Sequence, residues 1–153
     1  MEVTALALDA QMFLRLVIAT ILGAVVGYER EHAGKEAGMR THGMVSLGAT
    51  LFTVVSTHGF GNGDPGRVAA QIVTGIGFLG AGAILHHRGN IHGLTTAATL
   101  WVTAAIGLAV GVGMVLMSIA TTVLVFLLLR FGPRSGLLQR QTDTNTASER
   151  KSE

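Results

Sequence analysis

The amino-acid sequence predicts an all-α protein, a polytopic transmembrane bundle of about five short helices rich in Gly and Ala. Hydrophobic residues make up 49% of the chain and charged residues only 13%, with a mean hydropathy of +0.52. A soluble domain carries about 25% charged residues. The 21 glycines suit closely packed membrane helices, because a missing side chain lets two backbones approach. The apolar surface therefore needs lipid or partner helices.

Apolar runs separated by short polar segments predict the five helices. They cover approximately residues 12–28, 43–58, 67–85, 97–112 and 114–130. Asp64-Pro65 marks the start of the third, since Asp accepts hydrogen bonds from free helix N–H groups and Pro loses none at the first position. The uncharged stretch from Ala97 to Leu129 exceeds one span of about 20 residues, so we divide it near Gly111-Val112-Gly113.

The rest of the domain organisation follows from these runs. Residues 1–132 form the predicted membrane domain, and residues 133–153 are too polar to bury a core and are predicted to be a disordered cytoplasmic tail. No basic segment precedes the first run, so we expect it to stay as an anchor and not to be cleaved as a signal peptide.

The basic residues predict an orientation. With five spans, nine Lys and Arg residues fall on one side and two near the other. The nine are Arg30, Lys35, Arg40, Arg88, Arg130, Arg134, Arg140, Arg150 and Lys151, and the two are Arg15 and Arg67. The positive-inside rule then puts the N-terminus outside and the C-terminus in the cytoplasm.

Small residues at helical spacing predict close helix packing. Ala19, Gly23 and Gly27 recur every four residues on the first helix. The third helix has two such sides, one with Ala70, Thr74, Gly77 and Ala81 and another with Gly75 and Gly82, and Gly80 lies between them. We therefore expect the third helix to lie centrally, between two neighbours. A pore or a sliding interface is the alternative to simple packing.

Charged and polar groups near the spans are candidates for function, since burying them in lipid is costly. The candidates are Glu29, Arg30, Arg40, Thr41, His42, Asp64, Arg67, Gln71, Thr95 and Thr96. The charges that follow the first helix could equally form a solvated loop. Arg15 could be functional or could anchor the helix by extending its side chain to the membrane surface.

Ligand chemistry is scarce in the predicted spans, which contain no Asp or Glu. Magnesium prefers carboxylate oxygens with retained waters, so this argues against a magnesium channel formed by one chain, although oligomeric rings could hold hydrated ions. His86, His87 and His92 share one loop and could bind a transition metal, sense pH or simply lie at the lipid headgroups. A metal site is therefore undetermined.

No catalytic pattern is recognisable in the sequence. A serine-histidine-acid set, a phosphate-binding glycine loop and a dinucleotide fingerprint are all missing from a suitable context. We therefore predict a protein that is not an enzyme, with no catalytic residues, no cofactor and no nucleic-acid partner.

Several ordered motifs carry a resemblance to a known family. They are Gly27-Tyr28-Glu29-Arg30, Ala37 to His42, Asp64 to Arg67, Gln71 to Gly82, and Gly93 to Trp101. At compatible spacing over most of residues 23 to 113, they make the chain similar to the MgtC/SapB membrane proteins of bacteria. It looks like a short form without the C-terminal soluble domain of longer members. Thr95 stands where some virulence-associated members carry Asn, so roles that need that domain or that Asn are not carried over.

The resemblance implies a bacterial inner-membrane protein linked to growth at low magnesium and, in pathogens, to survival in macrophages. Family members are described more as regulators than as transporters, and the best-known member is reported to bind and inhibit the membrane ATP synthase. We therefore expect a regulator that contacts the lipid bilayer and another membrane complex or a second copy of itself. A transporter or channel for magnesium or another small solute, and an oligomeric scaffold, are the alternatives.

Overall fold

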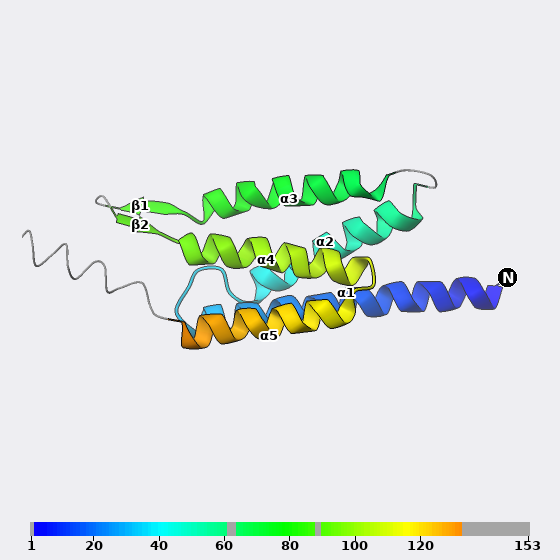
Figure 1. The fold of residues 1–153 in the computed structure, drawn as a ribbon, viewed down its shortest axis with the longest axis horizontal. Helices are drawn as coiled ribbons and strands as arrows, with labels where there is room; N and C mark the ends of the chain where they lie inside the picture. The colour runs from blue at the N-terminus through cyan, green and yellow to red at the C-terminus, as the bar shows by residue number, and fades with distance from the viewer. Residues whose placement is uncertain (1, 61–63, 88–89, 133–153) are drawn as a thin grey trace, which may run out of the picture.

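The computed structural model describes residues 2–60, 64–87 and 90–132, and it contains five helices and one hairpin (Figure 1). The helices are α1 (Glu2–His32), α2 (Met39–His58), α3 (Pro65–Gly82), α4 (Leu94–Gly111) and α5 (Val115–Phe131). Strands β1 (Leu85–His87) and β2 (Asn90–His92) pair antiparallel. The predicted helical fold class is confirmed, with a short hairpin where we expected a plain loop. The tail predicted to be disordered lies outside the described residues.

Successive helices run in opposite directions along the bundle. The end of α1, the start of α2, strands β1 and β2 and the end of α5 lie at one end, and the end of α2, the start of α3 and the α4–α5 turn lie at the other (Figure 1). This alternation is the arrangement that repeated membrane crossing requires. Within the described residues, only α1 and α4 are individually long and apolar enough to pass for membrane spans, and α5 is a shorter apolar helix.

Helix α1 is longer than the apolar run predicted. It begins at Glu2 instead of residue 12, and its 31 residues extend about 46 Å, so that its first turns project beyond the other helices (Figure 1). No Gly or Pro precedes Gly23 in this segment, and Ala and Leu favour the helix. The helix propensity of these residues therefore extends α1 toward the N-terminus, beyond the start of the apolar run.

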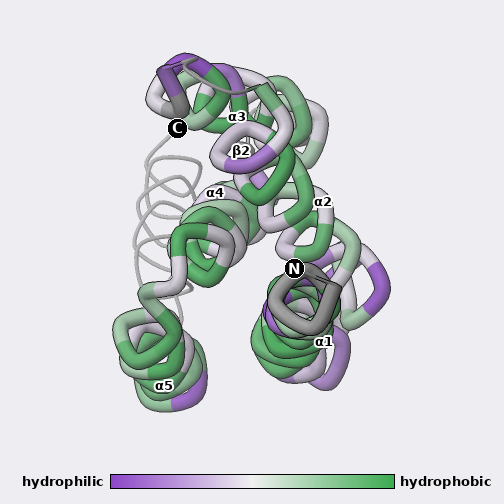
Figure 2. Tube along the Cα trace, turned by 90° about the vertical axis from the view of Figure 1, so that its right-hand side faces the viewer, coloured by the Kyte–Doolittle hydropathy of each residue, from purple (hydrophilic) through white to green (hydrophobic). Residues whose placement is uncertain are grey.

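The distribution of polarity is inverted relative to a soluble protein. Phe78, Leu116 and Leu128 are 82%, 80% and 71% exposed, whereas Thr50 and Thr103 are fully buried. Hydrophobic residues dominate the turns of α1, α4 and α5 along the bundle (Figure 2). Such a large apolar exterior is stable only where something other than water covers it, and a bilayer does so.

Helix α2 lies against α1 at the two glycines that the sequence singled out. A Cβ atom on Gly23 would lie 2.6 Å from the His42 carbonyl oxygen, and one on Gly27 would lie 2.6 Å from both the Gly38 oxygen and the Met39 Cα. The obstructing atoms belong to backbone and cannot rotate away. Gly23 and Gly27 lie on one face of α1 because they are four residues apart, and their missing side chains allow the short distance between α1 and α2.

Helix α4 approaches α2 in the same way, and it too meets α2 at Ser46. A Cβ on Gly107 would collide with the backbone of Ser46, and one on Gly111 would lie 2.6 Å from the Thr53 Cβ. Helix α4 also contacts α1, α3 and α5, so it occupies the centre of the bundle in the end-on view (Figure 2). The core is thus the trio α1, α2 and α4.

The prediction of a central α3 is wrong, because this helix lies at the side of the bundle on α4 and α2 (Figure 2). A Cβ on Gly80 would make ordinary contact with Ala97 of α4, at 3.7 Å. Gly75, Gly77 and Gly82 have no atom within 4 Å of a Cβ position. Small residues make a helix face smooth, but their spacing does not determine what lies against that face.

Arg15 makes a contact that neither interpretation of the sequence contained. Its Nη1 donates to the Gly111 carbonyl oxygen at 2.8 Å, at the end of α4. The last carbonyls of a helix lack intrahelical donors and carry partial negative charge, so a guanidinium stabilises them. Gly113, with φ of +93°, makes the turn beneath the guanidinium. Arg15 therefore ties the middle of α1 to the α4–α5 turn.

We expect Gly27→Ala to lower the free energy of unfolding by about 1–3 kcal/mol, because α1 and α2 must move apart to admit the methyl group. Gly48→Ala is the matched control, since its Cβ position on α2 has nothing within 4 Å. There, Ala should stabilise the helix by up to about 1 kcal/mol. Reversible SDS unfolding in mixed micelles measures both, and equal effects would contradict the close approach at Gly27.

Candidate functional site

A buried strip of polar residues runs between α2 and α4. On α2, His42, Ser46, Thr50 and Thr53 share one face at spacings of four, four and three, and on α4 Thr96, Thr99 and Thr103 do the same. All seven are at most 7% exposed. We call these seven residues the polar seam. Small hydroxyl side chains fit where two helices approach too closely for larger ones, which is why the seam follows the glycine contacts.

Backbone carbonyls accept most of the hydroxyl hydrogens in the seam. Thr53 donates to the Ala49 oxygen at 2.7 Å and Thr103 to the Thr99 oxygen at 2.7 Å. Thr50 reaches both the Ser46 oxygen of its own helix, at 2.9 Å, and the Gly107 oxygen of α4, at 2.7 Å. The Thr50 hydroxyl therefore joins α2 to α4, whereas those of Thr53 and Thr103 bond within their own helices.

His42 is the one ionisable residue of the seam, and it is completely buried. Its Nδ1 lies 3.0 Å from the Gly38 carbonyl oxygen, which can only accept, so Nδ1 carries a hydrogen. Its Nε2 lies 3.1 Å from the Thr99 Oγ1, which also lies 2.8 Å from the Thr96 oxygen. The imidazole therefore links the first turn of α2 to α4.

The hydrogens of this chain can be arranged in two ways. A neutral His42 accepts at Nε2 the single hydroxyl hydrogen of Thr99. A doubly protonated His42 donates from both nitrogens, and Thr99 then donates to the Thr96 carbonyl. Uptake of one proton at Nε2 of His42, together with rotation of the Thr99 hydroxyl, converts the first arrangement into the second, so the link between α2 and α4 is available in both.

Arg30 is buried beside the seam at the end of α1. It is 5% exposed, and its Nη1 lies 3.4 Å from the Glu29 Oε2, a long ion pair within one turn. Its Nε has no hydrogen-bond partner among the described residues. A buried guanidinium with an unused donor is costly, and Glu29 compensates only part of its charge.

Glu31 connects the same end of α1 to the start of α2. Its Oε2 accepts a hydrogen bond from the Met39 backbone N–H at 3.0 Å. Gly38 occupies the N-cap position and has no side chain to cap the helix. The carboxylate of Glu31 supplies that cap from eight residues earlier, where it also favours the positive end of the helix dipole. Sequence reasoning placed Glu31 in a charged loop and missed this role.

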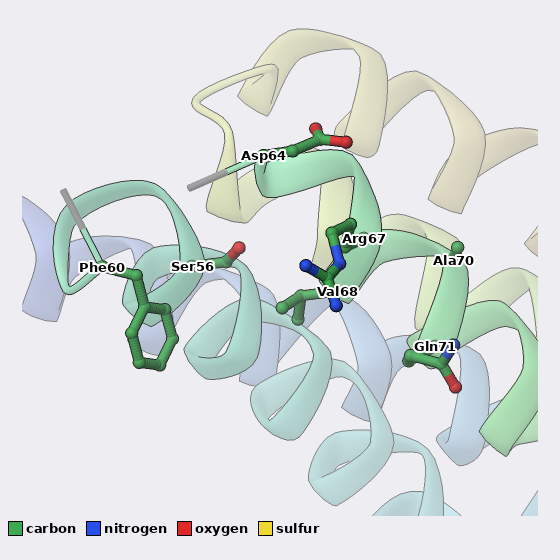
Figure 3. Close-up of a pocket in the computed structure, with 7 residues that line it drawn as sticks. All are labelled: Ser56, Phe60, Asp64, Arg67, Val68, Ala70 and Gln71. Atoms are coloured by element: carbon green, nitrogen blue, oxygen red, sulfur yellow. The ribbon is translucent and has the colours of Figure 1, made fainter. Parts of the chain in front are cut away.

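A second group of predicted residues lies at the other end of α2, around a pocket of about 470 Å³ (Figure 3). Asp64 is the N-cap of α3 and accepts from the Gly66 N–H at 2.8 Å, which confirms the predicted helix start. Arg67 and Gln71 line the pocket together with Ser56 and Phe60. The polar candidates therefore divide into two groups about 20 Å apart along α2, one at His42 and the other at Ser56.

The remaining candidates lie outside both groups. Arg40 and Thr95 are exposed, and Thr41 is partly buried in a groove between α2 and α3. His92 is exposed, and the side chains of His86 and His87 lie outside the described residues. In the part of the chain that the structure describes, no three or more His, Cys, Asp or Glu side chains gather where they could hold a metal ion.

The spacing of the glycines on α4 could have predicted its close packing, but sequence reasoning did not use it. Gly107 and Gly111 are four residues apart, as Gly23 and Gly27 are, but Gly111 served only to mark a helix boundary. The contacts between α2 and α4 could not be predicted from the sequence, because each joins residues far apart in the chain. Thr50 and Gly107 are 57 residues apart, as are His42 and Thr99.

An apolar exterior, a hydroxyl-lined interior and glycine contacts between antiparallel helices together define a helical membrane protein. The family model described as the MgtC family matches residues 16–136, and the chain belongs to this family. This confirms the resemblance that the sequence motifs indicated. No solved structure matches the chain.

Curated bacterial relatives agree with this family. "Putative magnesium transporter YhiD" of Escherichia coli K12 is 46% identical over 130 residues, which cover 80% of this chain and 60% of that protein. "Protein MgtC" of Salmonella typhimurium LT2 is 46% identical over 112 residues, or 73% and 48% of the two chains. "Protein MgtC" of Brucella abortus is 47% identical over 107 residues, or 70% and 45%. The chain thus spans about half the length of the curated relatives it matches.

We expect Thr99→Val to lower the free energy of unfolding by about 1–3 kcal/mol, because it leaves the buried Nε2 of His42 without a partner. Thr103→Val is the matched control, since this equally buried hydroxyl bonds only within its own helix. Its loss should cost less than about 1 kcal/mol. SDS unfolding of the two variants compares them, and a smaller effect at Thr99 than at Thr103 would contradict the link between α2 and α4.

Proposed function

We propose that this protein is a non-enzymatic regulator in the bacterial inner membrane, linked to adaptation to low magnesium. It acts on a membrane partner, such as the ATP synthase, through contacts between helices. Family membership and the magnesium-related name of the Escherichia coli relative support the magnesium link. The observation that carries the contact mechanism is the exposed, small-residue face of α3.

That face consists of Ala70, Thr74, Gly77 and Ala81, all of which are exposed. We call these four residues the outer face of α3. Gly77 has nothing within 4 Å of its Cβ position, and the neighbouring Phe78 is 82% exposed. Small residues at these spacings let another membrane helix approach closely, and a large aromatic beside them adds contact area. The position of α3 at the side of the bundle leaves this face accessible.

The chemistry of the interior favours contact over transport. Helices α2 to α5 contain no Asp or Glu, and the seam hydroxyls mostly donate to backbone carbonyls. Dehydrating magnesium requires oxygen ligands, usually including carboxylates. A path for the ion through the seam would have to separate helices whose backbones are in contact at Gly23 and Gly107.

We expect Gly77→Leu to reduce co-purification of the partner severalfold while leaving the fold intact, because the side chain enters open space on the outer face of α3. Affinity purification from bacterial membranes, followed by immunoblotting for ATP synthase subunits, measures the association. Ala120→Leu on the exposed side of α5 is the matched control and should retain it. Equal recovery with both variants would count against docking through α3, and a protein purified without any partner would count against regulation by contact.

A transporter or channel for magnesium or another small solute is the second candidate, and the name of the Escherichia coli relative favours it. Flux into proteoliposomes that contain only the purified protein distinguishes the two. Magnesium uptake well above that of empty liposomes would establish transport, and its absence across a range of cations would exclude it.

The proposed topology has five membrane crossings with the N-terminus outside and the C-terminus in the cytoplasm. The alternating helix directions support it (Figure 1), as do four described basic residues at the end where α1 and α5 stop and α2 starts, Arg30, Lys35, Arg40 and Arg130. Alkaline phosphatase fused to the N-terminal side should be active, since this enzyme requires the periplasm, and a fluorescent protein at the C-terminus should be bright. A cytoplasmic N-terminus would rule out the five-crossing topology.

A further inference from the structure

An apolar groove of about 650 Å³ lies between α2 and α3. Met44, Gly48 and Phe52 line it from α2, and Ile72, Gly75 and Leu79 line it from α3. Gly48 and Gly75 both have nothing within 4 Å of a Cβ position, so the glycines of both helices open the groove. Its volume lies in the range of about 300–1,000 Å³ that is usual for small-molecule sites.

The groove continues into the polar pocket at the start of α3. Val68 and Gln71 line both cavities, so that one end of a continuous cleft is apolar and the other is polar. Arg67 supplies a positive charge at the polar end, with Ser56 of α2 near it and Gln71 one turn further along α3 (Figure 3). The cleft is therefore amphipathic along its length.

Arg67 has no ion pair with any described carboxylate. Asp64 also lines the pocket, but its carboxylate accepts from the Gly66 N–H and points away from the Arg67 guanidinium (Figure 3). A guanidinium presents several donors in a planar fork that matches a phosphate group. An anionic group at this end of the cleft would compensate the positive charge of Arg67, which no described carboxylate pairs with.

We propose that this cleft is a binding site for one anionic phospholipid. The phosphate lies against Arg67 and Gln71, and one acyl chain lies in the groove between Phe52 and Leu79. The bilayer supplies such a molecule at high concentration, and a guanidinium can pair with the phosphate of a lipid in the outer leaflet, where the proposed topology places Arg67. The lipid would fill the gap between α3 and the core, and this inference does not rest on the regulatory function proposed above.

Native mass spectrometry of the whole protein, purified with an equimolar mixture of phosphatidylglycerol and phosphatidylcholine, tests the site. We expect phosphatidylglycerol to be retained about tenfold over phosphatidylcholine, as a charge-assisted phosphate contact predicts. In Arg67→Gln the preference should fall to about one while lipid still binds, and Arg67→Lys should keep part of it. Arg130→Gln, an exposed cation on α5, is the matched control and should change nothing.

A bulky residue in the groove tests the acyl-chain position separately. Gly75→Phe should remove both lipids, whereas Ala120→Phe on α5 should retain them, with the fold of each checked by SDS unfolding. Equal retention of the two lipids by the wild type, a preference that survives Arg67→Gln, or unchanged binding in Gly75→Phe would overturn the proposal. Displacement of the lipid by an equimolar fatty acid would identify a different occupant and would also overturn it.

Discussion

The close approach of the α2 backbone to α1 and α4 is the constraint on which the rest of the structure depends. Ser46 lies at the crossing, with Gly23 on one side and Gly107 on the other, and no larger residue fits at either glycine. Helices this close leave room only for small side chains between them. Thr50 fits, and its hydroxyl must find a carbonyl because water does not reach it. The polar interior is thus a consequence of the close packing.

The same constraint explains the arrangement of the outer helices. Once α1, α2 and α4 contact one another through glycines, α5 packs along α1 and α4, and α3 retains only α4 and part of α2. Helix α3, like α5, therefore lies at the outside of the bundle, with one side on an apolar groove and another on the outer face that contains Gly77. In a membrane, these two sides are where lipid and other proteins compete with the bundle for contact. Function by contact is consequently most readily placed on α3.

The sequence predicted the elements of this fold better than their arrangement. Apolar runs located all five helices, Asp64 marked a helix start, and the spacing of Gly23 and Gly27 identified a face that does pack closely. These signals are local, since each depends on residues within a few turns. The spacing on α3 was equally clear, but the partner of a smooth face is a nonlocal property. The link from His42 to Thr99 spans 57 residues, and Arg15 reaches across 96, so composition and periodicity could not reveal either.

The candidate site shows the same limit, with a consequence for function. Sequence reasoning selected Arg30, His42, Asp64 and Arg67 because ionisable groups are expensive in a membrane, and this criterion does not separate structural from functional use. In the structure, Asp64 caps a helix and His42 joins two helices. Arg30 and Arg67 differ from them, since neither is fully compensated by the described residues. Arg30 is enclosed by the core, whereas Arg67 is exposed and lines a pocket. Of these four residues, Arg67 is therefore the one whose chemistry is available to another molecule.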